Sequence, residues 1–291
     1  MGPGDPFNPD RDIPSLEGKV ILITGGNAGI GKQSALALSK HQPSEIWIAA
    51  RNAKKAETAI AEIKQQSPGV DVRFLELDLS SFASVKSAAQ TFLKSVSRLD
   101  ILMLNAGIMA CPPGQTSEGY EVQFGTNHMG HVLLTKSLLP LLTHTASSSP
   151  GGDVRVVSVS SMAHKFGPSG GIQFDTLKST ASGMSTTDRY GQSKLANILF
   201  IRELALRHTE LTPVSIHPGT VKTDLQNSNG GSWMLSAFQK FVVPLVGLRE
   251  LRPGEYYVPV GVSGNGSQLS KDKVLAKKLW DWTEKELESQ I

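Results

Sequence analysis

The fold of this chain is decided by KVILITGGNAGIGK, residues 19–32. Its apolar run is too short for a helix and has no polar interruption, which is typical of a strand buried on both faces of a parallel sheet. Glycines follow at once, and an alanine- and leucine-rich segment comes next. The stretch therefore predicts a strand, a tight turn and a helix.

The glycines of this turn indicate a site for an anion. Gly25, Gly29 and Gly31 allow the backbone to turn tightly and to approach a ligand, and the N–H groups that open the next helix point toward it. A dinucleotide pyrophosphate is the natural ligand. The spacing Thr-Gly-x-x-x-Gly-x-Gly differs from the usual Gly-x-Gly-x-x-Gly, so a plain glycine-rich turn is the alternative.

Composition is that of one globular domain with a large core. The chain has 291 residues, of which 39% are hydrophobic and 19% charged. A net charge of +3 without lysine and arginine runs argues against a nucleic-acid partner. We expect residues 1–15 to be flexible, and we expect neither a signal peptide nor an integral membrane segment. The lone Cys111 is compatible with a reducing compartment, so a cytoplasmic location is expected.

The first unit is repeated along residues 16–291. Alternation of strands and helices predicts an α/β, Rossmann-type doubly wound parallel sheet in a single domain. The strands are expected at 19–24, 45–50, 71–77, 99–104, 154–159, 213–217 and 255–259. The helices are expected at 53–66, 82–96, 190–208 and 274–289, with others ending at residue 40 and beginning near residue 120.

The residue after the second strand points to the kind of cofactor. Arg51 stands 20 residues after Gly31, where an NAD-binding unit would place an acidic residue for the ribose 2′-hydroxyl. A cation suits a 2′-phosphate instead, so NADP(H) is expected. The alternative is a solvated arginine, with Lys54 and Lys55 as ordinary surface of the following helix.

An ordered set of motifs resembles one family. The motifs are the turn of residues 24–31, Asp78, Asn105-Ala106-Gly107, Asn127, Ser161, Tyr190-x-x-x-Lys194 and Pro218-Gly219. Together they resemble the short-chain dehydrogenase/reductase family of classical type, from about residue 13 onward. The segments 127–131, 160–164 and 193–197 are similar to its retinol-dehydrogenase-like and fungal reductase branch.

Tyr190 and Lys194 are the expected centre of the chemistry. They are four residues apart in a segment with helical periodicity, so both project from one face. A nearby ammonium favours the ionised phenol, which makes Tyr190 the expected proton donor and acceptor. The resemblance implies that Lys194 also binds the nicotinamide ribose. An exposed tyrosine and lysine pair is the structural alternative.

The other catalytic residues follow from the family pattern. Ser161 is expected to hydrogen-bond the substrate oxygen, whereas Ser160 is expected to bond only the backbone. The resemblance implies that Asn127 holds a water in a proton relay to Lys194, although a purely structural asparagine is an open alternative. The expected cofactor contacts are Gly25, Asn27, Gly29, Ile30, Gly31, Arg51, Asp78, Leu79, Asn105, Ala106, Gly107, Tyr190, Lys194, Pro218, Gly219, Val221 and Thr223.

Three further features lie outside these motifs. His128, His131 and His164 lack a third ligand at metal spacing, so we expect structural histidines and no metal. The polar insertion 165–188 is expected at the substrate mouth. The apolar segment 225–254 resembles a lid that is shortened, because little chain is left for a crossover helix before the last strand.

The sequence therefore predicts an NADP-dependent oxidoreductase. It would transfer hydride between NADPH and a lipophilic carbonyl or alcohol, and a homodimer is left open. The alternative is a cofactor-binding protein of the same fold whose turnover is weak or lost because the lid is short. An epimerase or dehydratase is less favoured, since no further acid or base accompanies Tyr190.

Overall fold

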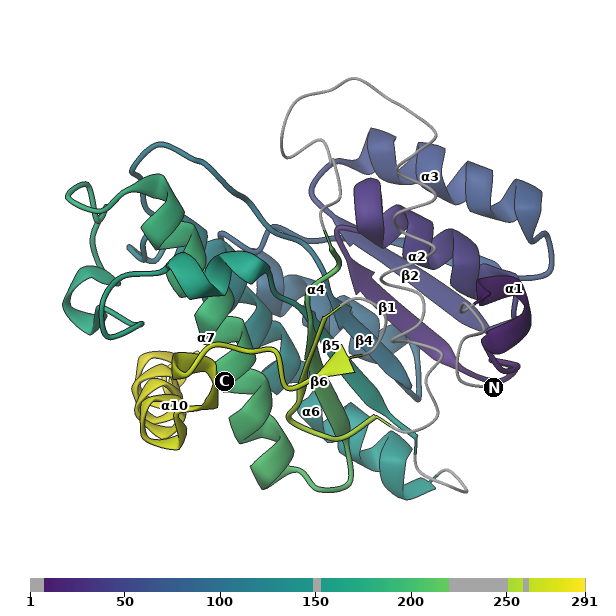
Figure 1. Cartoon of the computed structure of the whole chain (residues 1–291). Coiled ribbons are helices and arrows are strands. Elements are labelled where there is room, and N and C mark those ends of the chain that lie inside the picture. The colour runs from purple at the N-terminus through teal and green to yellow at the C-terminus, as the bar shows by residue number, and fades with distance from the viewer. Residues whose placement is uncertain (1–7, 149–152, 220–250, 259–261, 291) are drawn as a thin grey trace.

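The computed structural model describes residues 8–148, 153–219, 251–258 and 262–290. They form one eight-stranded sheet with helices on both faces (Figure 1), in the strand order β3-β2-β1-β4-β5-β6-β7-β8. The strands are β1 Val20–Thr24, β2 Glu45–Ala50, β3 Asp71–Glu76, β4 Ile101–Leu104, β5 Arg155–Val159, β6 Thr212–Ile216, β7 Tyr256–Val258 and β8 Val262–Ser263. The predicted α/β doubly wound sheet is confirmed.

The seven predicted strands pair in parallel, and only the short β8, which was not predicted, pairs antiparallel within the described sheet. β1 lies between β2 and β4, with Ile21 paired to both Ile46 and Ile101. The order in which strands are added to the sheet thus reverses at β1, which opens a crevice beyond the carboxyl ends of β1 and β4.

Strands β1 to β5 each supply both layers of the core, because successive side chains point to opposite faces. In β1, Val20 and Leu22 join one buried cluster, whereas Ile21 and Ile23 join the other. The first cluster includes α4 Phe82–Ser95, α6 Gly130–Ser148 and α7 Thr186–Arg207. The second includes α2 Gly29–Ser39 and α3 Ala53–Gln66. Burial on both faces explains why the central strands β1 and β4 are nearly continuous apolar runs.

The helical segment that contains Asn127 is not a regular α-helix. Val122–Phe124 forms a short α-helix, α5, and Gly125–Met129 is a π-helical turn that leads into α6. Asn127 is at the centre of this turn. Single π turns inside helices are often found at functional sites, because they turn a backbone carbonyl away from its usual partner.

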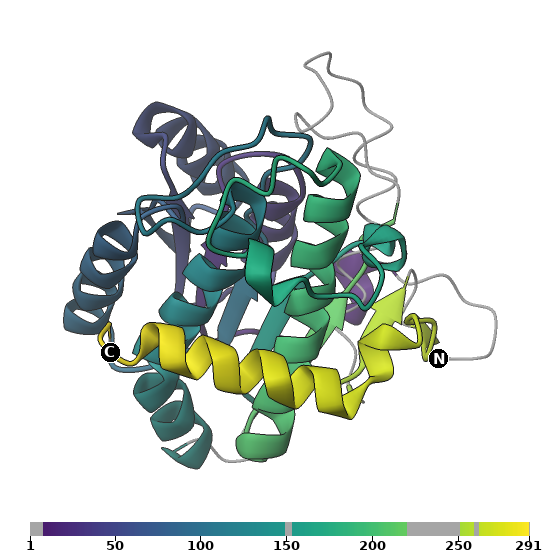
Figure 2. The same cartoon turned by 90° about the vertical axis from the view of Figure 1, so that its left-hand side faces the viewer.

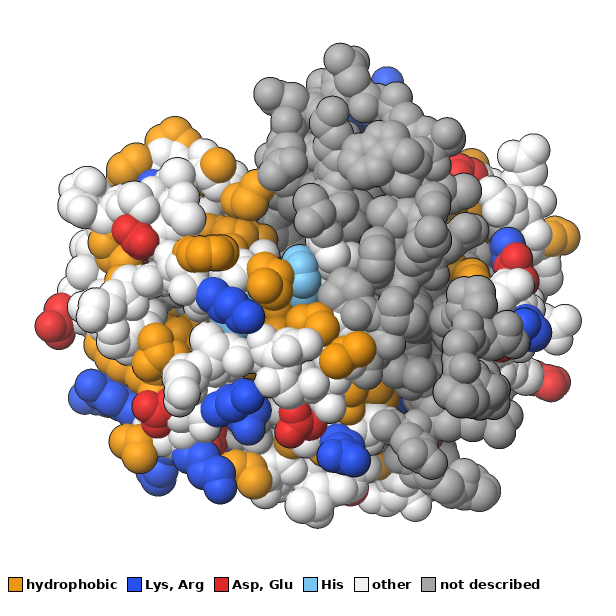
Figure 3. All heavy atoms as spheres, viewed as in Figure 1, with side chains coloured by type: hydrophobic (Ala, Val, Ile, Leu, Met, Phe, Trp, Pro, Cys, Tyr) orange, Lys and Arg blue, Asp and Glu red, His pale blue; other side chains and the backbone are white. Residues whose placement is uncertain are grey.

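The predicted tail helix is observed as α10, Lys273–Leu287, which crosses the outer side of α7 (Figure 2). Trp280 stacks on Phe200 with ring centres 5.5 Å apart. Lys136 of α6 pairs with Glu284 at 2.6 Å. Charged side chains of both signs lie over this region in Figure 3, while hydrophobic side chains gather nearer the middle of that face. None of the described helices is long and apolar enough to cross a membrane.

The chain before β1 includes a helical turn, α1, Pro9–Asp12, capped by the Asn8 side chain. Ile13 is buried in the second cluster, so residues 8–15 contain ordered contacts where a flexible segment was expected. The expected crossover and nearly all of the lid, residues 220–250, lie outside the described residues.

A buried ion pair fixes the start of α7. Arg189 and Glu121 are 2% and 0% exposed, and their charged groups are 3.0 Å apart. Arg189 also donates to the carbonyl oxygen of Cys111 at 2.9 Å, and Glu121 accepts the backbone N–H of Phe124. The pair therefore joins α7 to the loop after β4 and to the helix that leads to Asn127.

Removing one charge from this pair should strongly destabilise the protein. We expect Arg189→Met to lower the free energy of unfolding by about 3–5 kcal/mol, because Glu121 is left as an unpaired buried carboxylate. Arg189→Met combined with Glu121→Gln should recover part of this loss. Urea unfolding at neutral pH measures both, and an Arg189→Met protein as stable as the wild type would contradict the interpretation.

Candidate active site

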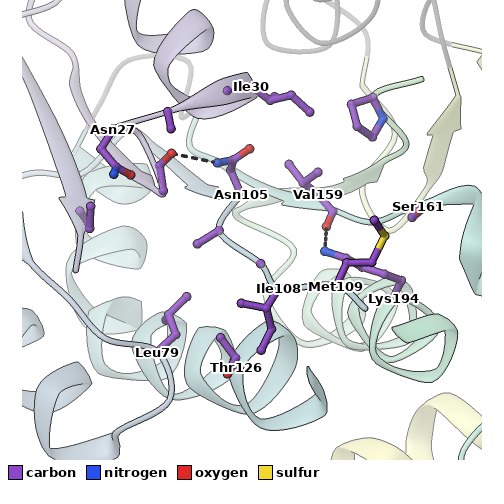
Figure 4. Close-up of a pocket in the computed structure, with 18 of the residues that line it drawn as sticks. Asn27, Ile30, Leu79, Asn105, Ile108, Met109, Thr126, Val159, Ser161 and Lys194 are labelled. Atoms are coloured by element: carbon purple, nitrogen blue, oxygen red, sulfur yellow. Dashed lines mark hydrogen bonds between the residues drawn. The ribbon is translucent and has the colours of Figure 1, made fainter. Parts of the chain in front are cut away.

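A cavity of about 650 Å³ lies beyond the carboxyl ends of the strands, at the β1/β4 crevice (Figure 4). It brings together fifteen of the residues predicted from the sequence. They are Gly25, Asn27, Gly29, Ile30, Arg51, Asp78, Leu79, Asn105, Ala106, Gly107, Ser161, Tyr190, Lys194, Pro218 and Gly219.

The glycine turn fits a bound pyrophosphate. Gly25 and Gly29 have φ of +66° and +51°, a backbone conformation that other residues rarely adopt. A Cβ atom on Gly31 would lie 2.5 Å from the carbonyl oxygen of Gly25, so the turn can close only with glycine there. No side chain caps the start of α2 at Ala28, which leaves its N–H groups directed to an anion. Gly31 lies behind the cavity wall, so its role is to shape the turn.

The Thr24 hydroxyl joins the ends of β1 and β4. It accepts the backbone N–H groups of Asn105 and Ala106 at 2.9 and 3.0 Å. With both lone pairs used, its proton is free to bond Nε2 of His131, 2.9 Å away. The Asn105 side chain donates back to the carbonyl oxygen of Thr24 at 2.8 Å. These bonds hold the floor of the crevice in one geometry.

Asn127 lies behind this floor and does not line the cavity. Its side chain accepts the backbone N–H of Ile108 at 2.8 Å and donates to the Ile108 carbonyl at 2.9 Å and to Ser193 Oγ at 3.0 Å. Its own carbonyl oxygen lies 3.0 Å from Nδ1 of His131. The structural alternative for Asn127 is therefore observed, and the expected water relay stays a prediction.

Tyr190 and Lys194 project together from α7 into the cavity, as their spacing predicts. Lys194 Nζ lies 5.7 Å from the centre of the Tyr190 ring and donates to the carbonyl oxygen of Val159 at 2.9 Å (Figure 4). Burial lowers the pKa of Lys194 to about 8, so its ammonium is charged at neutral pH. Burial raises the pKa of Tyr190, and the neighbouring Ser161 side chain opposes this rise.

The two serines after β5 differ as predicted in their surroundings. Ser160 is buried and donates its hydroxyl to the carbonyl oxygen of Lys194 at 2.7 Å, which confirms its backbone bond. The Ser161 hydroxyl caps a 3₁₀ turn, Met162–Phe166, by accepting the N–H of Ala163 at 3.1 Å. Ser161 and Tyr190 line the same cavity, so a substrate oxygen bound there could meet both hydroxyl groups.

Two cations lie at the opposite end of the cavity. Arg51 follows β2, and Lys55 is in the first turn of α3; both are exposed and line the cavity. Asn52 caps α3 by accepting the N–H of Lys55 at 2.9 Å. Lys54 is exposed but does not line the cavity. The arrangement places two positive charges beside the β2 end, a suitable place for a phosphate group.

Comparisons with known proteins agree with this geometry. A family model described as short chain dehydrogenase matches residues 19–189. A short-chain dehydrogenase/reductase of Aspergillus calidoustus is 36% identical, over 99% of this chain and 98% of that protein. The chain belongs to the short-chain dehydrogenase/reductase family. It is also 35% identical to retinol dehydrogenase 11 of Homo sapiens, over 91% of this chain and 85% of that protein.

A solved structure has the same architecture. The crystal structure of a Mycobacterium paratuberculosis protein superposes with a TM-score of 0.77 at 30% identity, covering 97% of each chain. The resemblance to the short-chain dehydrogenase/reductase family, retinol-dehydrogenase-like branch, is thus confirmed. Members of this family are oxidoreductases that bind a nicotinamide cofactor.

This short-chain dehydrogenase/reductase has cavity residues that sequence analysis missed. They are Ala28, Ala49, Ala50, Asn52, Lys55, Leu77, Ile108, Met109, Thr126, Val159, Ser160, Met162 and His217. Nine of the thirteen are next to a predicted site residue in the sequence, and this adjacency was the available signal. Val221 and Thr223 lie outside the described residues. Insertion residues 165–188 do not line this cavity; Ile172 and Leu177 pack in the core instead.

The three histidines singled out in the sequence are buried and hydrogen-bonded. His128 Nδ1 lies 3.3 Å from the Asn197 side chain, and His131 bonds Thr24 as described above. His164 bonds the backbone of Ser161. In the described part of the chain, no three His, Cys, Asp or Glu side chains are grouped to hold a metal ion.

Burial of His128 should make stability pH-dependent. Burial lowers its pKa to about 4, so the unfolded chain binds a proton below pH 6.5 that the folded chain does not. Between pH 7 and pH 5 the free energy of unfolding should therefore fall by about 2 kcal/mol on account of this residue. The ring lies between Phe124 and Phe200, so His128→Phe fits the site and removes the titration.

Urea unfolding of both proteins at the two pH values tests this expectation. The loss of stability between pH 7 and pH 5 should be smaller in the His128→Phe variant by about 2 kcal/mol. The same pH dependence in both proteins would show that His128 is protonated equally in the folded and unfolded chains.

Proposed function

We propose that this short-chain dehydrogenase/reductase transfers hydride between NADPH and a lipophilic carbonyl or alcohol, with Tyr190 as proton donor and acceptor. The observation that carries the proposal is the convergence of Tyr190, Lys194 and Ser161 at one end of a cavity whose other end holds Arg51 and Lys55. When bound, the cofactor supplies the hydride. All other steps use side chains of the chain itself.

Proton transfer is the task of Tyr190. Its phenol carries a proton at pH 7, as an ordinary tyrosine does, and burial raises its pKa further, so in reduction it can give that proton to the carbonyl oxygen. The Ser161 hydroxyl hydrogen-bonds the same oxygen and stabilises the charge that develops there. The Lys194 ammonium, held by the Val159 carbonyl, stabilises the phenolate that remains.

Orientation of the cofactor is assigned to the rest of the cavity. The glycine turn and the start of α2 bind the pyrophosphate, and Asp78, Leu79, Asn105, Ala106 and Gly107 line the adjoining wall. Pro218 and Gly219 lie near the nicotinamide end, as the family pattern suggests. Arg51 and Lys55 bind the 2′-phosphate, which favours NADPH over NADH.

The substrate side of the cavity is apolar. Ile108, Met109 and Met162 line the same cavity as Ser161. Such a wall favours a lipophilic molecule, since each buried CH₂ group stabilises binding by about 0.8 kcal/mol. A relative named retinol dehydrogenase 11 is compatible with this substrate class.

Replacing Tyr190 by Phe tests the chemistry. We expect NADPH consumption with a panel of lipophilic ketones and aldehydes to fall at least 10²-fold, because the proton donor is removed, while NADPH binding changes little. The absorbance of NADPH measures its consumption, and fluorescence titration measures its binding. Turnover that is equal in both proteins would overturn the assigned role of Tyr190.

Replacing Lys55 and Lys54 of α3 one at a time tests the cofactor preference. Lys55→Ala should weaken NADPH binding by roughly 10-fold or more, because a hydrogen bond to a charged group contributes about 1.5–3 kcal/mol. NADH binding should be unaffected. Lys54→Ala is the matched control, since Lys54 is one residue away and does not line the cavity. Equal losses for both cofactors would argue against a 2′-phosphate at Lys55.

A second candidate is a cofactor-binding protein with weak or no turnover. The alignment with the Aspergillus calidoustus relative runs over 321 positions, more than the 291 residues here, so the relative has segments without a counterpart in this chain. A shortened lid over residues 225–254 is our proposal for one of them. NADPH binding without Tyr190-dependent turnover would favour this candidate.

A further inference from the structure

The side chain of His164 connects Ser161 to the carboxyl-terminal part of the chain. His164 is 2% exposed and lies in the 3₁₀ turn that Ser161 caps. Its Nδ1 is 2.6 Å from the carbonyl oxygen of Ser161, and its Nε2 is 3.1 Å from the backbone nitrogen of Ser267. Ser267 is 103 residues further along the chain, just before α10.

Both partners of the ring are backbone groups, and this fixes its protonation. A carbonyl oxygen can only accept and a backbone N–H can only donate, so the ring must carry its proton on Nδ1 and keep Nε2 as an acceptor. Burial lowers the pKa of His164, in agreement with a neutral ring. The imidazole therefore bridges two backbone segments with one hydrogen bond of each kind.

Packing leaves the turn of Ser161 little freedom. On one side it lies against α7, where a Cβ atom on Gly191 would be 2.7 Å from the carbonyl oxygen of Ala163. On the other side the His164 ring contacts Tyr256 of β7 edge-on, with ring centres 4.9 Å apart. Ser267 is itself held by Ser270, whose hydroxyl donates to the Ser267 carbonyl at 2.7 Å. The turn is thus fixed between the helix of Tyr190 and the carboxyl-terminal segment.

We propose that His164 is a positioning residue for catalysis: its Nδ1–H bond to the Ser161 carbonyl holds the Ser161 hydroxyl in place beside Tyr190. The inference rests on the proposed function of Ser161. His164 touches neither the reacting atoms nor the cavity, and it acts through Ser161 alone. The Nε2 bond to Ser267 serves to orient the ring.

Two substitutions separate the two bonds of the ring. An asparagine amide nitrogen can take the place of Nδ1, so His164→Asn keeps the bond to Ser161 and loses the bond to Ser267. A glutamine oxygen can take the place of Nε2, so His164→Gln keeps Ser267 and loses Ser161. Each variant loses one buried hydrogen bond, so a purely structural role would affect both alike.

The kinetic experiment compares these variants with the wild type under NADPH-saturated conditions. We expect His164→Asn to retain kcat within about threefold, and His164→Gln to lower kcat and kcat/KM together by roughly tenfold or more, with unchanged NADPH binding. In a Ser161→Ala background, His164→Gln should have no further effect. Equal kcat values for the two variants, or additive losses in that background, would overturn the proposal.

A second measurement does not need turnover. The Ser161 interaction lowers the pKa of Tyr190, so a displaced hydroxyl should raise it. Ultraviolet titration of the phenols, with Tyr190→Phe to identify the signal, should show a higher Tyr190 pKa in His164→Gln than in the wild type and in His164→Asn. No such difference would count against the positioning role. If the difference is seen while the wild type reduces no ketone, the proposed function fails and the positioning role stands.

Discussion

The structure depends on the hydroxyl of Thr24, which joins the ends of two strands that are far apart in the sequence. It accepts two N–H groups from the chain leaving β4 and is bonded to His131 on α6. The crevice lies between β1 and β4 because the order of the strands reverses at β1. The Thr24 hydroxyl fixes the geometry of its floor. The other ring nitrogen of His131 is bonded to the carbonyl oxygen of Asn127. The phosphate-binding end and the catalytic end therefore share one buried hydrogen-bond network.

Most of the fold could be predicted because its determinants are local. Strands buried on both faces are continuous apolar runs, and the helical spacing of Tyr190 and Lys194 puts them on one face. The start of α7 was placed at Tyr190 and is observed at Thr186. Ser185 caps this helix by accepting the backbone N–H of Asp188, and its hydroxyl donates to the Asp188 carboxylate. A serine followed three residues later by an acidic residue is a capping pattern that the sequence contains.

The rest of the site depends on contacts that sequence spacing does not encode. Lys55 lines the cavity and Lys54 does not, because neighbouring residues of a helix point in directions about 100° apart and the cavity lies on one side of α3. Asn127 lies in a π turn and does not line the cavity, and neither fact follows from the spacing of the sequence motifs. The orientation of the His164 ring depends on Ser267, a partner that is 103 residues away.

The central place of β1 has a consequence for synthesis of the chain. During translation β1 and β2 can pair as soon as both have emerged, but the other edge of β1 stays open until residues 101–104 are made. An apolar strand with an unpaired edge is prone to intermolecular pairing. The nascent chain therefore carries an aggregation hazard over some eighty residues of elongation, between the end of β1 and the arrival of β4, and a chaperone that shields this edge would increase the yield of folded protein.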